Sequence, residues 1–224
     1  ALRFAFFIHV DFVTWLSIYF AVMVPALLLT FAALLYRLLF ILAGAPVDWA
    51  NFSPLASLFL CSGLFLSVKR AVLLPALGLL ISDVLINAHF HAPLIDTRMI
   101  PGYFCFGMIF LLGTWLRHQH ITRPILVLLA AVSSSIPFYL VTNTIDWYFD
   151  APIPLSIPLY PKTFAGWLQA LTLGHPGFPP TYLFLRNTVL SDLLFTSLFL
   201  LTQALLRPHR ASSDLPGQFT HPTV

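Results

Sequence analysis

The chain has 224 residues, of which 59% are hydrophobic and 8% are charged, and its formal net charge is +3 at pH 7. A soluble domain has about 25% charged residues, so 11 basic and 8 acidic side chains are too few to cover a water-exposed surface. The composition excludes an ordinary soluble enzyme and an intrinsically disordered chain, and it predicts an all-α polytopic membrane protein whose main partner is the lipid bilayer.

Six hydrophobic stretches predict six transmembrane helices, because a helix needs about 20 apolar residues to cross the hydrocarbon core. They cover residues 12–36, 52–68, 71–88, 99–116, 124–145 and 182–206. Residues 146–180 precede the last helix and contain seven prolines, so they predict an outer loop with one short helix over residues 162–173. We therefore expect a single transmembrane domain over residues 1–206 and a polar tail over residues 207–224.

The basic residues predict the orientation, because the cytoplasmic loops of membrane proteins carry an excess of Lys and Arg. With the N-terminus inside, the cytoplasmic segments hold Arg3, Lys69, Arg70, Arg117, Arg123, Arg207 and Arg210. The outer segments hold Arg98 and Lys162, with Arg37 and Arg186 near helix ends. We therefore expect both termini in the cytoplasm. The same rule explains the positive net charge, so nucleic-acid binding is not expected.

Two aspartates lie inside predicted spans, where a carboxylate is costly and usually has a specific role. Asp83 and Asp192 occur in similar contexts, LISDVLI at residues 80–86 and LSDLL at residues 190–194. Asn87 shares a helix face with Asp83, and Thr188 shares one with Asp192. One interpretation is a ligand site or an ion-coupled pathway. The preferred one is a structural network that locks helix packing, with Arg186 as the expected cation and Asn51 as a further partner.

Other residue types give weaker indications. The spacing of Cys61 and Cys105 predicts neither a disulfide nor a metal site, and the sequence identifies no cofactor. The histidines are expected in solvated loops. No nucleotide-binding, hydrolase or metalloprotease motif is present, so no catalytic residue is predicted. Close helix contacts are expected at the small residues Ser62, Gly63, Gly78, Gly107, Gly113 and Ser133 to Ser135.

Several segments together resemble a family of uncharacterised bacterial inner-membrane proteins, known only as a domain of unknown function. They are NFSPLA at 51–56, ISDVL at 81–85, VTN at 141–143, YPKTFAG at 160–166, RNT at 186–188 and SDL at 191–193. The resemblance covers residues 30–206 and implies the bacterial inner membrane. That family is similar to the S components of energy-coupling-factor vitamin transporters, which bind a vitamin in a pocket that opens outward.

The S components share a glycine and an aspartate on their third helix, as GLLISD does at residues 78–83. They dock on an energising module through AxxxA spacing on the first helix. Residues 25–33 read PALLLTFAA and lack that spacing. The resemblance therefore implies ligand binding rather than a particular energy source.

Two functions follow as expectations. The first is binding or uptake of a small organic molecule in an outer pocket formed by residues 45–54, 88–102 and 146–187. Its ligand-binding residues would be Asn51, Asn143, Trp147, Trp167, Arg186 and Asn187. The second is a non-catalytic accessory subunit of a larger membrane complex, in which other subunits order the C-terminal tail.

Overall fold

The computed structural model describes residues 28, 30–44, 46–66, 72–149 and 160–206. Every regular element within these ranges is helical, so the all-α class is confirmed. The elements are a helix over Thr30–Leu42, η1 (Val47–Trp49), α2 (Leu55–Phe65), α3 (Leu73–His89), η2 (Thr97–Met99), α4 (Ile100–His118), α5 (Pro124–Phe149), α6 (Phe164–Leu171) and α7 (Tyr182–Leu206). The short helix expected within the proline-rich segment is therefore present as α6.

Among the described helices, three are long and apolar enough to cross a membrane, namely α4, α5 and α7. The Thr30–Leu42 helix, α2 and α3 are apolar but shorter. α2 has 11 residues, which corresponds to about 16 Å of helix, or half of the hydrocarbon thickness. The expected first span begins at residue 12 and therefore lies mostly outside the described residues, as does the tail over 207–224.

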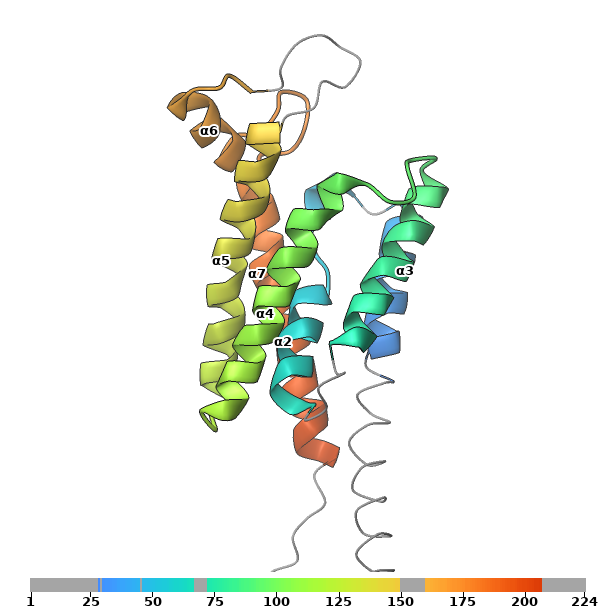
Figure 1. Cartoon of the computed structure of the whole chain (residues 1–224), viewed down its shortest axis with the longest axis vertical. Coiled ribbons are helices and arrows are strands. Elements are labelled where there is room, and N and C mark those ends of the chain that lie inside the picture. The colour runs from blue at the N-terminus through green and yellow to red at the C-terminus, as the bar shows by residue number, and fades with distance from the viewer. Residues whose placement is uncertain (1–27, 29, 45, 67–71, 150–159, 207–224) are drawn as a thin grey trace, which may run out of the picture.

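The helices form two groups that run roughly alongside each other (Figure 1). α5, α7, α4 and α2 make up the larger group, and α3 with the Thr30–Leu42 helix makes up the smaller one. The described loops over residues 90–99 and 160–181 lie at the upper end in this view, whereas the α4–α5 turn lies at the lower end.

α2 is the centre of the fold, since ten of its residues are buried. A helix that is apolar on all sides belongs inside a bundle. It contacts α4 through glycines. A Cβ atom on Gly113 would lie 2.1 Å from the Leu60 carbonyl oxygen, and one on Gly63 would lie 2.3 Å from that of Phe110. Gly78 likewise faces the Leu34 side chain. The expected close contacts are present at these three glycines.

At Gly107 the expectation of a close contact is wrong, because nothing lies within 4 Å of a Cβ atom there. Ser62, Ser134 and Ser135 are buried, whereas Ser133 is exposed. Small residues in a helix thus predict close approach only on the face that meets a neighbour.

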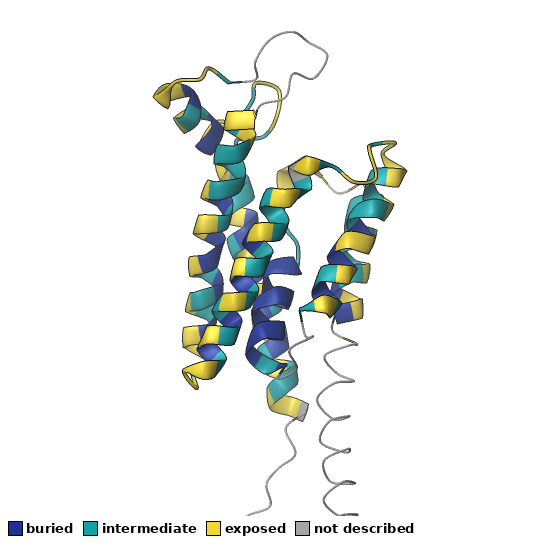
Figure 2. Ribbon diagram, viewed as in Figure 1, coloured by how far each residue is buried: buried dark blue, intermediate teal, exposed yellow. Residues whose placement is uncertain are grey.

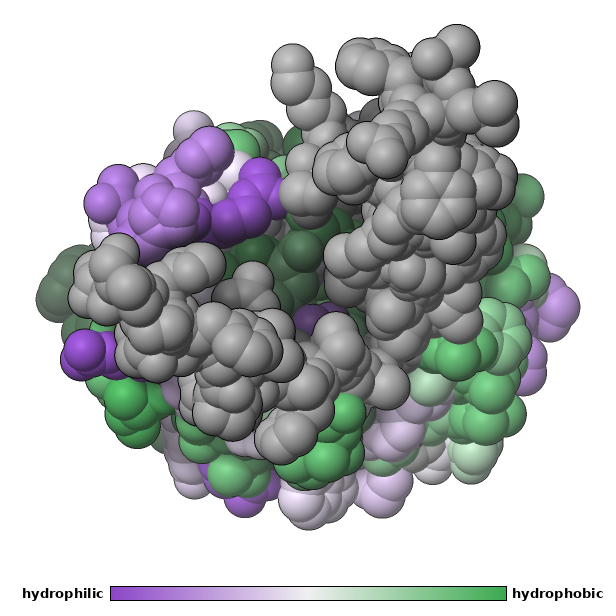
Figure 3. Space-filling view, turned by 90° about the horizontal axis from the view of Figure 1, so that it is seen from below, coloured by the Kyte–Doolittle hydropathy of each residue, from purple (hydrophilic) through white to green (hydrophobic). Residues whose placement is uncertain are grey.

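Exposed residues line the outward faces of the helices (Figure 2), and many of them are large and apolar. On α4 the exposed ones recur every three or four residues, at Phe104, Met108, Leu111 and Trp115. α7 repeats the pattern at Leu190, Leu194, Leu198, Leu201 and Leu205. Seen from the lower end, hydrophobic residues take up much of the visible rim (Figure 3). Water-exposed proteins rarely carry apolar surface of this extent, so the faces are compatible with lipid contact.

Candidate functional site

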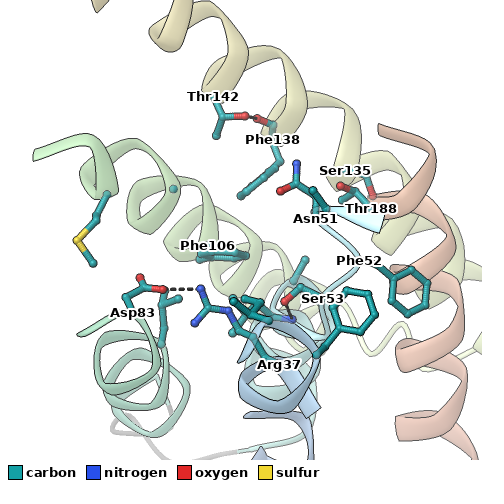
Figure 4. Close-up of a pocket in the computed structure, with 18 of the residues that line it drawn as sticks. Arg37, Asn51, Phe52, Ser53, Asp83, Phe106, Ser135, Phe138, Thr142 and Thr188 are labelled. Atoms are coloured by element: carbon teal, nitrogen blue, oxygen red, sulfur yellow. Dashed lines mark hydrogen bonds and ion pairs between the residues drawn. The ribbon is translucent and has the colours of Figure 1, made fainter. Parts of the chain in front are cut away.

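A cavity of about 740 Å³ lies between the two helix groups. Its wall is formed by the Thr30–Leu42 helix, the loop that precedes α2, and parts of α2, α3, α4, α5 and α7 (Figure 4). Six aromatic side chains line it, from Phe40, Phe52, Phe90, Tyr103, Phe106 and Phe138. Ligand pockets typically measure about 300–1,000 Å³ and are mostly apolar with a few polar groups. The volume and lining therefore suit a small organic molecule.

An ion pair between Arg37 and Asp83 forms one polar part of the wall (Figure 4). Arg37 Nη2 lies 2.5 Å from Asp83 Oδ1, and both side chains are 14% exposed. The Tyr103 hydroxyl donates to Asp83 Oδ2 at 2.9 Å, and Arg37 also donates to the Ser82 hydroxyl. The network joins the Thr30–Leu42 helix to α3 and α4, so it holds the smaller helix group against the larger one.

Asp192 forms a second polar cluster in the wall and is only 1% exposed. The Ser135 hydroxyl donates to its Oδ2 at 2.7 Å, and the Ser57 hydroxyl lies 3.4 Å from its Oδ1. Thr196 donates to Ser57 at 3.0 Å. Hydroxyl groups from α2, α5 and α7 thus surround this carboxylate. No cationic side chain forms an ion pair with it in the described part of the chain.

Asn51 lines the cavity with an amide that makes no hydrogen bond among the described residues. Its φ of 67° places it in the left-handed region, which Asn tolerates better than most residues. The hydroxyls of Thr142 and Thr188 also line the cavity, but each donates to a backbone carbonyl of its own helix. Asn51 is therefore a group with free hydrogen-bonding capacity toward an occupant.

Of the six ligand-binding residues expected from the sequence, the structure brings only Asn51 into the cavity wall. Asn143 lines a separate cavity of about 180 Å³ and donates to the Tyr139 carbonyl oxygen at 2.8 Å. Trp147 donates to the Pro161 carbonyl oxygen at 3.0 Å. Trp167 donates to the Thr144 hydroxyl at 2.9 Å. These two tryptophans fasten the loop and α6 to the end of α5.

Arg186 and Asn187 instead hold the loop that precedes α2. Asn187 is fully buried and donates to the carbonyl oxygens of Asp48 at 2.7 Å and Ala50 at 2.9 Å. The Arg186 guanidinium lies over the Trp49 ring, 5.7 Å from its centroid. Ala50 itself lines the cavity. Arg186 and Asn187 therefore influence the shape of the cavity by fixing the conformation of this loop.

Of the polar residues expected inside the membrane, some line the cavity and one does not. Asp83, Asp192 and Thr188 line the cavity, whereas Asn87 donates to the carbonyl oxygens of Pro93 and Leu94 in the turn after α3. The expected pairing of an aspartate with Arg186 is wrong, since Arg37 pairs with Asp83. Arg37 is far from Asp83 in sequence, so helix-face spacing could not have linked them.

Several residues of the site were not predicted as site residues from the sequence, namely Arg37, Ser57, Ser82, Tyr103, Ser135 and the cavity phenylalanines. For Arg37 a signal existed, because it interrupts an apolar run that continues to Gly44. The serines and phenylalanines resemble ordinary residues of an apolar span, so nothing in the sequence distinguishes them.

Cys61 and Cys105 are buried free thiols, as expected. Among the described residues no group of three His, Cys or Asp side chains could hold a metal ion. The histidines at positions 89, 91, 118 and 120 are exposed, in line with their expected place in loops and at helix ends.

The model of a family of unknown function, DUF6580, matches residues 19–214, and the chain belongs to this family. The expected membership of a family without a known function is thereby confirmed. Neither the curated proteins nor the solved structures include a match to the chain. The likeness to S components stays a prediction.

Proposed function

We propose that this chain is an integral membrane protein that binds a small organic molecule, in the manner of a transporter S component. One observation carries the proposal, the 740 Å³ cavity with six aromatic side chains and few polar groups in its wall. An apolar body would lie among the phenylalanines. Polar substituents would reach Asn51, Tyr103 and the Arg37–Asp83 pair, which would fix the orientation of the molecule.

A membrane location is supported by the large exposed apolar side chains on the helices and by the three long apolar helices among the described residues. We place the lower end in the cytoplasm, because Arg117 and Arg123 flank the α4–α5 turn there. The three shorter helices complete six passes with both termini cytoplasmic, in a bacterial inner membrane. α2 is compatible with this arrangement despite its length, because its neighbours shield it from lipid.

A flat, partly aromatic molecule of vitamin type suits the cavity best. Phe106 lies between Phe59, whose ring centroid is 5.2 Å away, and Phe138, at 5.1 Å. Such ring pairs offer rigid apolar faces against which a planar molecule can stack. The neighbouring carboxylate and guanidinium favour a molecule with both hydrogen-bond donors and acceptors.

Native mass spectrometry of gently solubilised protein tests the proposal, because it detects small ligands and stable partners together. Thr142→Phe should fill part of the cavity and reduce the amount of bound molecule. Thr202→Phe is the matched control, since Thr202 makes the same kind of backbone hydrogen bond in α7 and does not line the cavity. Equal ligand content in both variants would contradict the cavity as the binding site.

The alternative, a non-catalytic accessory subunit, is favoured by a different observation. Aromatic side chains are exposed at the upper end of the chain, at Tyr148, Phe149, Phe164, Phe178 and Tyr182. Another membrane subunit could cover them. Co-purification with other subunits in a fixed ratio, with no small molecule ever detected, would support this function over the first.

A further inference from the structure

The two aspartates in the cavity wall have opposite electrostatic surroundings. Asp83 has a guanidinium partner, Arg37. Asp192 is more deeply buried, at 1% exposure, and its partners are the hydroxyls of Ser57 and Ser135. Hydroxyl hydrogen bonds stabilise a carboxylate but do not neutralise it, and a buried charge requires compensation. A positive charge is therefore missing beside Asp192 among the described residues.

The oxygen atoms around Asp192 form a donor set from three helices. α7 supplies the two carboxylate oxygens and the Thr196 hydroxyl, α2 supplies Ser57, and α5 supplies Ser135. Ser57 Oγ also lies 3.3 Å from the backbone carbonyl oxygen of Asp192. A hydroxyl can turn its hydrogen away and offer a lone pair. Oxygen ligands with one formal negative charge suit a hard cation of charge +1.

Access to this set is available from the cavity. Ser135, Thr188 and Asp192 belong to its wall, so the buried carboxylate lies directly next to the cavity. The other charged groups that line the cavity are Arg37, Asp83 and Asp146. The Arg37–Asp83 pair contributes no net charge, so it leaves the attraction of Asp192 for a cation in place.

We propose that Asp192, Ser57 and Ser135 bind one sodium ion in the wall of the cavity. When bound, the ion neutralises Asp192 and draws α2, α5 and α7 together. Because these helices also enclose the cavity, sodium occupancy changes the affinity for the cavity molecule, and the molecule changes the affinity for sodium by the same factor. Only this last link rests on the proposed function.

Binding of radioactive sodium to the purified full-length protein, measured without any added organic ligand, tests the site. The expected result is saturable binding of one ion per chain. Asp192→Asn should abolish it, and Ser135→Ala should weaken it by about tenfold through the loss of one ligand. Ser133→Ala is the matched control, because Ser133 lies on the same helix but is exposed and donates to its own backbone.

A second measurement keeps the test informative if Asp192→Asn does not fold. The Tm of the wild-type protein should rise with sodium chloride but not with N-methyl-D-glucamine chloride at equal ionic strength. A Tm that ignores sodium and depends only on pH would identify a proton as the occupant and overturn the proposal, as would sodium binding that is equal in the Ser133→Ala and Ser135→Ala variants. Absence of an organic ligand would affect only the proposed function.

Discussion

Replacing Asp83 with Leu should destabilise the protein strongly. It leaves the Arg37 guanidinium without its partner, although the Arg37 side chain is only 14% exposed. Breaking a buried ion pair by removing one member costs about 3–5 kcal/mol. The Tyr103 hydroxyl loses its acceptor as well, which adds about 1–3 kcal/mol. The double variant Arg37→Met with Asp83→Leu removes both charges and retains only the cost of the lost Tyr103 acceptor. It should therefore be more stable than the single variant Asp83→Leu.

A double-mutant cycle measures the difference. The fraction of folded protein is followed in mixed detergent as the denaturing detergent increases, for wild type, both single variants and the double variant. The coupling energy should be about 2 kcal/mol or more in favour of the native pair. Arg123→Met combined with Asp83→Leu is the control, because Arg123 is exposed and the two costs should add. Additive costs for Arg37 and Asp83 as well would refute the ion pair.

Three further predictions concern packing and topology. Gly113→Ala should destabilise the α2–α4 contact by about 1–3 kcal/mol, whereas Gly107→Ala, with nothing within 4 Å, should be neutral or stabilising; equal effects in thermal unfolding would contradict the close contact. Tyr139→Phe removes a hydrogen bond to a carbonyl oxygen of α6 and should cost about 1 kcal/mol, seen as a lower Tm. Cysteines introduced at Ala165 and His118, both exposed, should react with an impermeant reagent from opposite sides of the membrane, and labelling from one side only would rule out the proposed orientation.

Much of the fold follows from composition and from the charged and proline-rich segments that separate the apolar runs. Long apolar runs that end at charged or proline-rich segments predicted where helices lie, and the structure has a helix in each of the five predicted spans from residue 52 onward. The first predicted span lies mostly outside the described residues. Length was overestimated where the apolar run continues beyond the helix. α2 ends at Phe65 although apolar residues follow it. Hydrophobicity shows that a residue avoids water, but a helix end depends on backbone hydrogen bonds that hydrophobicity does not encode.

The positions of the expected ligand residues in the fold were harder to predict, because large polar and aromatic side chains near helix ends can face either a cavity or a loop. Such side chains are equally suited to fastening loops. Trp147 and Asn187 both donate to backbone carbonyl oxygens of loop residues, which a single sequence cannot distinguish from ligand contacts. Their role is decided by loop conformation, and loop conformation is the least predictable part of the chain.

The two aspartates show most clearly where local sequence stops being informative. Both follow a serine and precede apolar residues, and both lie on the side of a helix that faces the cavity. The difference between them comes from other helices, because Arg37 reaches Asp83 while Ser57 and Ser135 reach Asp192. An ion pair makes Asp83 part of the scaffold, whereas a hydroxyl shell leaves Asp192 with a charge still to be neutralised. A role in ion binding is therefore set by the partners that packing brings to a carboxylate, and Asp192 is the one whose partners leave that role open.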